Sequence, residues 1–289
     1  DSEPVKQYAF IQDNDFMYFT GLNVPEARMI IQKKNDNLLS NLYIERQIPD
    51  RIVWDGRKIT ADEAKDLSGA NTVFFLDVFE PSLLNIISSA SKVCLPFKTN
   101  SYSQSLSKAT GLAKKIKKYQ PYVVFGDASV MLTEMRSIKE DWEIAKIEEA
   151  IELTWAGLQD AFSKVKPGIY EYELEALVSY QIRKGGQKNW GFKPIIARGD
   201  NACTLHYELN NCQLRKGELV LFDVGALCDN YSADISRTIS VDKKFSPRHK
   251  DIYQRVLDTQ KEVIKKVKPG LSLMDLNNKT IELLTDALM

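Results

Sequence analysis

Residues 219–227 (LVLFDVGAL) and 231–241 (YSADISRTISV) read as the two strands of one antiparallel β-hairpin, joined by an Asp-Asn pair at 229–230. Asp and Asn favour the tight turn that such a connection needs. Asp223 and Asp234 lie one on each strand, eleven residues apart. Because facing residues across an even-numbered loop differ by an odd number, this spacing predicts both carboxyl groups on one face of the hairpin.

Two carboxylates in contact are unfavourable unless they share a proton or a cation lies between them, and desolvation increases the cost. The alternative is an ordinary strand pair whose acids face water, as is common on edge strands. The run LVLFDV at 219–224 is almost wholly apolar, however, which is typical of a buried strand. The sequence therefore favours a metal site at Asp223 and Asp234.

The composition excludes several other classes of protein. Lys and Arg number 39, as do Asp and Glu, so the formal charge is zero and we expect neither a nucleic-acid nor a membrane partner. The four cysteines match neither a zinc pattern nor a disulfide framework, which favours a reducing compartment. No apolar stretch approaches about 20 residues and no leader opens the chain. We expect a soluble, cytoplasmic protein.

The 289 residues predict two domains, with a boundary near Arg136. In the first domain, residues 1–136, short apolar strands alternate with helices, which indicates an α/β fold. A capping box at 60–63 and the apolar spacing of 105–119 predict two of these helices. The expected strands are residues 16–20, 27–32, 38–44, 72–76, 92–95 and 122–125.

The second domain, residues 137–289, opens with a predicted long amphipathic helix. Its expected start is a capping box, Ser-Ile-Lys-Glu, at Ser137. Apolar residues recur with helical spacing and are expected to face the core. They are Ile144, Ile147, Ile151, Trp155, Leu158 and Phe162.

An internal repeat organises this domain. The phrase Lys-Val-Lys-Pro-Gly followed by an aliphatic residue occurs at 164–169 and again at 266–271, each time after a long helical pattern. Pro and Gly should stop each helix, and a second helix is expected at 171–184 and at 273–288. The match on both sides favours duplication over a chance phrase. In a duplicated fold the remaining metal ligands would come from the second copy, which breaks off.

The chain has two histidines. His206 follows a Gly-Asp-Asn turn and precedes the hairpin, so it could project into the same cavity as the acids, although a lone histidine is more often structural. His249 follows a Ser and a Pro in the first turn of a predicted helix, and we expect it to be exposed and structural.

Several segments resemble known proteins. Residues 16–27 (FMYFTGLNVPEA) and 54–57 (WDGR) are similar to the N-terminal, creatinase-like domain of aminopeptidase P. Residues 199–207, 219–225 and 231–241 resemble the pita-bread catalytic domain that aminopeptidase P shares with prolidase, creatinase and methionine aminopeptidase. The resemblance covers nearly the whole chain and implies an α/β (α+β) fold with a creatinase-like domain followed by an incomplete pita-bread domain.

The resemblance also implies roles for three residues. Asp223 and Asp234 would be the first two of five ligands to two divalent ions, manganese with zinc or cobalt as alternatives. His206 would hold substrate and stabilise the tetrahedral intermediate. The family's remaining ligands, one His and two Glu, have no counterpart here, and one of those Glu residues is the usual general acid and base. The chain is therefore expected to be truncated, to bind the metals only weakly and to be inactive by itself.

For the intact protein, the resemblance implies a metalloaminopeptidase that hydrolyses the N-terminal Xaa-Pro bond with a hydroxide activated by two metals. Its partner would be a proline-containing peptide, and it would form a homodimer or homotetramer. An Xaa-Pro dipeptidase or a creatinase-like hydrolase is one alternative. A non-catalytic pita-bread binding module is another, but it would gain nothing from paired acids.

Overall fold

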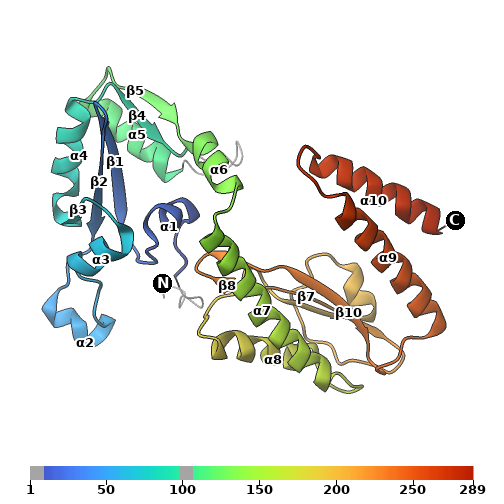
Figure 1. The fold of residues 1–289 in the computed structure, drawn as a ribbon. Coiled ribbons are helices and arrows are strands. Elements are labelled where there is room, and N and C mark those ends of the chain that lie inside the picture. Colours follow the sequence, from blue (N-terminus) through green and yellow to red (C-terminus); the bar gives the residue numbers. More distant parts are fainter. Residues whose placement is uncertain (1–9, 98–106, 289) are drawn as a thin grey trace. The chain divides into compact units, whose positions relative to one another are not determined.

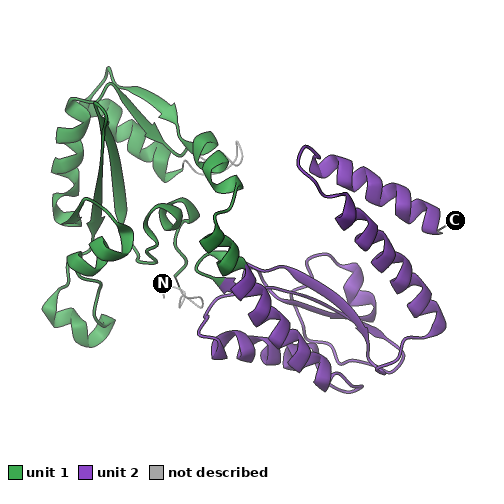
Figure 2. Ribbon diagram, in the orientation of Figure 1, with its two compact units in different colours: residues 1–147, 228–231 green, residues 148–227, 232–289 purple. Residues whose placement is uncertain are grey.

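The computed structural model describes residues 10–97 and 107–288. The chain divides into two compact units, residues 1–147 with 228–231 and residues 148–227 with 232–289 (Figure 2). Across the described stretches, no helix combines the length and the apolar character that a membrane span needs.

The first unit contains two small β-sheets (Figure 1). In one, β2 (Asn37–Ile44) pairs antiparallel with β1 (Arg28–Lys34) and parallel with β3 (Thr72–Phe75). In the other, β4 (Lys92–Leu95) and β5 (Val124–Asp127) are parallel. The helical elements of this unit are α1 (Asn14–Thr20), η1 (Pro49–Arg51), α2 (Ile52–Asp55), α3 (Ala61–Ser68), η2 (Leu76–Val78), α4 (Phe79–Ser88), α5 (Lys108–Tyr119) and α6 (Ser129–Ser137).

Five of the six expected strands correspond to β1 to β5, and the strand expected at residues 16–20 is wrong. Residues 16–20 belong to helix α1, because the Asp13 side chain accepts hydrogen bonds from the backbone N–H groups of Asp15 and Phe16 and so caps a helix there. The helix expected after residue 60 is α3, and both hydrogen bonds of its capping box are present. The start of the helix expected at 105–119 lies outside the described residues, and α5 forms the rest of it.

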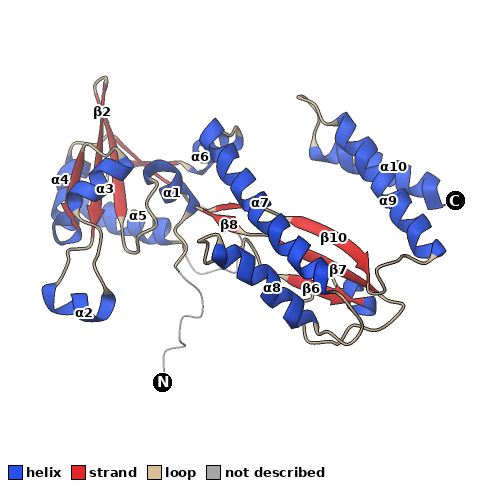
Figure 3. Cartoon of the chain, turned by 60° about the horizontal axis from the view of Figure 1, so that its bottom comes forward, coloured by secondary structure: helices blue, strands red, loops and turns tan. Residues whose placement is uncertain are grey.

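The second unit is built on a three-stranded antiparallel sheet, in the order β10 (Ile235–Ser240), β7 (Leu219–Val224) and β6 (Ile195–Arg198). Figure 3 shows α7 (Asp141–Lys164) and α8 (Glu171–Lys184) side by side along this sheet. The main core lies between the sheet and these two helices. Its fully buried residues include Leu158, Leu174, Val178, Ile196, Val220, Phe222 and Val224.

Helix α7 begins at Asp141, so the capping box expected at Ser137 is wrong. The Ser137 hydroxyl instead donates 2.8 Å to the carbonyl of Glu134 within α6. The buried side of α7 matches the expected one only in part: Leu158 is fully buried and Phe162 packs against the core, whereas Ile151 and Trp155 are 43% and 41% exposed. Small residues take the buried positions, since α7 and α8 approach closely: a Cβ added to Gly157 would lie 2.8 Å from Cγ1 of Val178.

The repeated phrase forms the same structure in both copies. Helices α7 and α9 (Pro247–Lys266) each end at the phrase, and α8 and α10 (Leu273–Leu288) follow, with the bounds that the sequence predicts for the second helix of each copy. Gly168 and Gly270 have φ values of 92° and 90°, a region that residues other than glycine rarely adopt. Each copy is therefore a helix, a stop and a second helix.

Candidate functional site

The register of β7 and β10 sets the positions of the two acids. Asp223 pairs with Ser236, and Asp234 precedes Ser236 by two residues. Facing residues share a face, and so do residues two apart on a strand. Asp223 lies in β7 and Asp234 immediately precedes β10, so the two acids lie on the same face, as their odd spacing predicts, and diagonal to each other.

The hairpin is not continuous as expected. Beyond β7 and β10 the chain forms a second short pair, β8 (Leu227–Cys228) and β9 (Tyr231–Ser232). At the break, a Cβ added to Gly225 would lie 1.8 Å from the carbonyl oxygen of Ala233, so only glycine fits there. The turn itself matches the expectation, since Asp229 and Asn230 have φ values of 46° and 69°.

Both carboxyl groups have close polar neighbours. The Ser236 hydroxyl donates a hydrogen bond of 2.8 Å to Oδ1 of Asp223. Desolvation raises the pKa of Asp234 above its ordinary value, and the charge of Asp223 and a hydrogen bond between the two carboxyl groups raise it further. Asp234 as a residue is exposed. A bound cation would offset the repulsion between the Asp223 and Asp234 carboxylates, which is one cause of the raised pKa.

The segment that carries His206 packs on the same face of the sheet. Ile195 in β6 faces Asp223 in the register, and Ile195 and Ala197 form a small buried cluster with Tyr207. Tyr207 therefore lies on the acid face, while alternate residues such as Phe222 face α7 and α8. His206 precedes Tyr207 in a turn after η3 (Gly199–Cys203), and it is exposed.

The donor set fits part of a site for a hard divalent cation. Two carboxylates offer the oxygen ligands that such ions prefer, and a cation between them would offset their mutual repulsion. Among the described residues, however, no group of three or more His, Cys, Asp and Glu side chains gathers in a way that could hold a metal ion. Asp223 and Asp234 form a pair, and their surroundings add the Ser236 hydroxyl.

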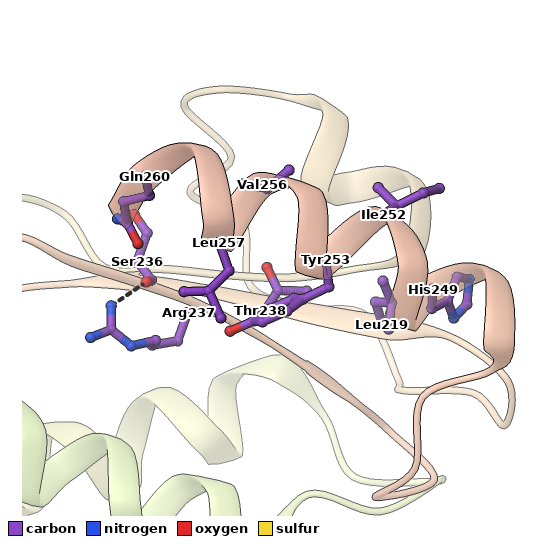
Figure 4. Close-up of a pocket in the computed structure, with 10 residues that line it drawn as sticks. All are labelled: Leu219, Ser236, Arg237, Thr238, His249, Ile252, Tyr253, Val256, Leu257 and Gln260. Carbon is purple, nitrogen blue, oxygen red and sulfur yellow. Dashed lines mark hydrogen bonds between the residues drawn. The ribbon is translucent and has the colours of Figure 1, made fainter. Parts of the chain in front are cut away.

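A groove of about 480 Å³ lies between β10 and α9 (Figure 4), and one of its lining residues is Ser236, which donates to Asp223. Ser236, Arg237 and Thr238 line it from the strand, and the Arg237 guanidinium lies 5.8 Å from the ring of Trp155 in α7. His249 also lines the groove and is half-buried, so the expectation of an exposed His249 is wrong. Its helix position is as expected, because the Ser246 hydroxyl accepts a hydrogen bond from the His249 backbone N–H.

Ser236 is the neighbour of the acids that sequence reasoning missed. A usable signal was present, because Ser236 is separated from Asp223 by an odd number of residues and from Asp234 by two. The rule that places the two acids on one face also places Ser236 there.

Comparisons with known proteins agree with this architecture. Residues 145–288 match the model of metallopeptidase family M24, and residues 2–95 match the N-terminal domain of aminopeptidase P. The chain is 27% identical to the Xaa-Pro aminopeptidase of Escherichia coli and 29% identical to that of Haemophilus influenzae, in each case over 98% of its length. It spans only 65% and 64% of those two proteins.

Solved structures show the same likeness. A Bacillus anthracis protein provisionally named aminopeptidase P is 33% identical, with a TM-score of 0.94, and the match covers 99% of this chain and 69% of that one. Aminopeptidase P from Escherichia coli, in its low-pH form, is 26% identical with a TM-score of 0.89 and coverage of 99% and 66%. On this evidence, the chain belongs to the aminopeptidase P family, whose catalytic part is a pita-bread domain of metallopeptidase family M24.

Proposed function

We propose that this chain forms part of a metalloaminopeptidase that releases the N-terminal residue from peptides with proline in the second position. The observation that carries the proposal is the pairing of Asp223 and Asp234 on one sheet face, in a chain whose relatives are Xaa-Pro aminopeptidases. A binding module without chemistry would have no use for two acids that repel each other.

We infer that Asp223 and Asp234 supply two ligands to a pair of divalent manganese ions. When bound, such ions would activate water and polarise the scissile carbonyl. Ser236 holds the Asp223 carboxylate in one orientation. His206, on the exposed turn beside the acid face, would donate a hydrogen bond to the carbonyl oxygen as negative charge develops there.

The 289-residue chain by itself should bind divalent metal weakly and should not turn over peptide detectably. The reason is the ligand count, since the described residues bring two acids together and no group of three. Metal affinity falls steeply when ligands are missing from a site. For the protein in the cell we propose a cytoplasmic location, which the spacing of the four cysteines supports because it matches no disulfide framework, although one relative, from Arabidopsis thaliana, is named as mitochondrial.

Hydrolysis assays test the function. The protein isolated from the cells that make it should release the first residue from Xaa-Pro peptides of three or more residues when Mn²⁺ is supplied. Cleavage of Xaa-Pro dipeptides alone would favour a dipeptidase instead. No cleavage of any such peptide, with metal present and the protein folded, would favour the binding module.

A further inference from the structure

Glu171 is a buried acid that accepts four hydrogen bonds, and the proposed chemistry does not use it. It is the first residue of α8 and is fully buried. Its carboxylate accepts four hydrogen bonds. The donors are Arg198 N at 2.8 Å, Asn201 Nδ2 at 3.0 Å, Tyr207 Oη at 2.7 Å and Cys212 N at 2.8 Å.

Each of these neighbours donates, so the arrangement suits an ionised carboxylate, which accepts at both oxygens. Oε1 receives Arg198 and Asn201, and Oε2 receives Tyr207 and Cys212. Burial, followed by the hydrogen bond to Glu171, raises the pKa of Tyr207, so the phenol keeps the proton that it donates. The start of α8 adds the favourable field of a helix N-terminus.

All four donors come from one segment, residues 198–212, that leaves β6 and returns toward β7. His206 and Leu205 protrude from it, and Leu205 is 87% exposed. Asn201 precedes this exposed turn and Tyr207 follows it, and both are held by the same carboxylate. Asn201 also donates to the Tyr207 hydroxyl at 3.0 Å, which closes the network beneath the turn.

We propose that Glu171 is the positioning residue for His206: by holding Asn201 and Tyr207 on either side of the exposed turn, it fixes where the imidazole stands over the acid face. The inference rests on the proposed function, because His206 contacts substrate only if that function is correct. The contacts themselves do not depend on that function. Glu171 touches neither acid nor substrate and acts through the segment that it holds.

Histidine NMR tests this in the 289-residue chain, because its two histidines give two imidazole signals and His249 serves as an internal reference. In Glu171→Gln, one hydrogen-bond acceptor becomes an NH₂ group facing donors, so the His206 signal should shift and broaden while that of His249 stays in place. Glu173→Gln is the matched control. Glu173 lies two residues along α8, is exposed and accepts the Tyr170 N–H at 2.8 Å, so its loss weakens the helix cap without touching the turn.

An unchanged His206 signal in folded Glu171→Gln would overturn the proposal. So would equal shifts of both histidines in Glu171→Gln and Glu173→Gln, because that pattern indicates a general structural role. If Glu171→Gln does not fold, Tyr207→Phe decides, since it removes the hydroxyl that donates to Glu171 and accepts from Asn201, and keeps the ring on Ile195 and Ala197. It should shift the His206 signal alone, and no shift would again overturn the proposal.

The readout separates this proposal from the proposed function, because it needs no catalysis. A displaced His206 signal in Glu171→Gln, together with no Xaa-Pro cleavage by the protein isolated from the cells that make it, would contradict the function and leave the positioning role intact. An unchanged signal in an active peptidase would contradict the positioning role alone.

Discussion

Ser236 Oγ donates a hydrogen bond of 2.8 Å to Oδ1 of Asp223, its register partner across the β7–β10 pair. The contact occupies a lone pair on one carboxylate oxygen and leaves the other oxygen, Oδ2, for another partner. A carboxylate held in this way loses little rotational freedom when it binds a cation, and such outer partners commonly tune metal affinity. The strand register thus places the orienting group as well as the two acids.

Ser236→Ala should therefore weaken metal binding. Loss of an outer partner typically lowers affinity about 10-fold to 100-fold. Because Ser236 is exposed, the cost in folding free energy should stay near the lower end of about 0.5–1.5 kcal/mol. Mn²⁺ titration and urea unfolding measure the two effects.

Ser240→Ala is the control for that substitution. Ser240 lies on the same strand and makes a hydrogen bond of the same length, 2.8 Å, to the carbonyl of Lys244, away from the acids. It should lower stability and leave Mn²⁺ affinity unchanged. Equal affinities for the two variants would show that Ser236 does not orient Asp223.

The raised pKa of Asp234 predicts a pH dependence of stability in the metal-free chain. The folded state holds this proton more tightly than the unfolded state, whose aspartate pKa is about 3.9. Stability is therefore lost as the pH rises from that value through the higher pKa of the folded state. Asp234→Asn cannot ionise and avoids the loss.

Urea unfolding in the presence of a chelator, from about pH 3 to about pH 7, measures this effect. The free energy of unfolding of Asp234→Asn, minus that of the unchanged chain, should rise with pH and then level off. Contributions from acids that do not interact with Asp234 cancel in the difference. A difference that stays flat or falls with pH would mean that Asp223 does not repel Asp234.

The close contact between α7 and α8 predicts that Gly157→Ala is destabilising. The added Cβ would lie 2.8 Å from Cγ1 and 3.1 Å from Cα of Val178, and backbone atoms cannot move aside cheaply. Overpacking of this kind costs about 1–3 kcal/mol. Urea unfolding followed by circular dichroism measures the loss.

Gly111→Ala provides the matched control within α5. A Cβ there meets nothing within 4 Å, so the helix should gain up to about 1 kcal/mol from the better helix former. Stability changes of the same sign in the two variants would contradict the packing that we describe for Gly157.

Short-range patterns in the sequence predict much of the fold. The two Pro-Gly stops place the ends of α7 and α9, and the odd spacing of Asp223 and Asp234 predicts their common face. Helix α1 was missed because Phe16, Tyr18 and Phe19 have the composition of a strand, whereas the Asp13 cap decides the local structure. Hydrophobic spacing alone does not decide between a helix that one capping residue starts and a strand that a run of aromatic residues suggests.

The supporting residues of the site were harder to foresee. Glu171 meets Tyr207 across 36 residues and Cys212 across 41, and no periodic pattern links positions so far apart. The buried side of α7 was misjudged for a related reason. Helix approach at Gly157 selects small residues, which hydrophobic spacing ranks below Ile151 and Trp155.

The central claim is that Asp223 and Asp234 together hold a divalent cation. Titration of the 289-residue chain with Mn²⁺, followed by the electron paramagnetic resonance of the free ion, tests it even if binding is weak. We predict saturable binding that is lost in both Asp223→Asn and Asp234→Asn and kept in Asp229→Asn, the same change in the hairpin turn. Binding that survives in either of the first two variants, or that disappears equally in all three, would contradict the claim.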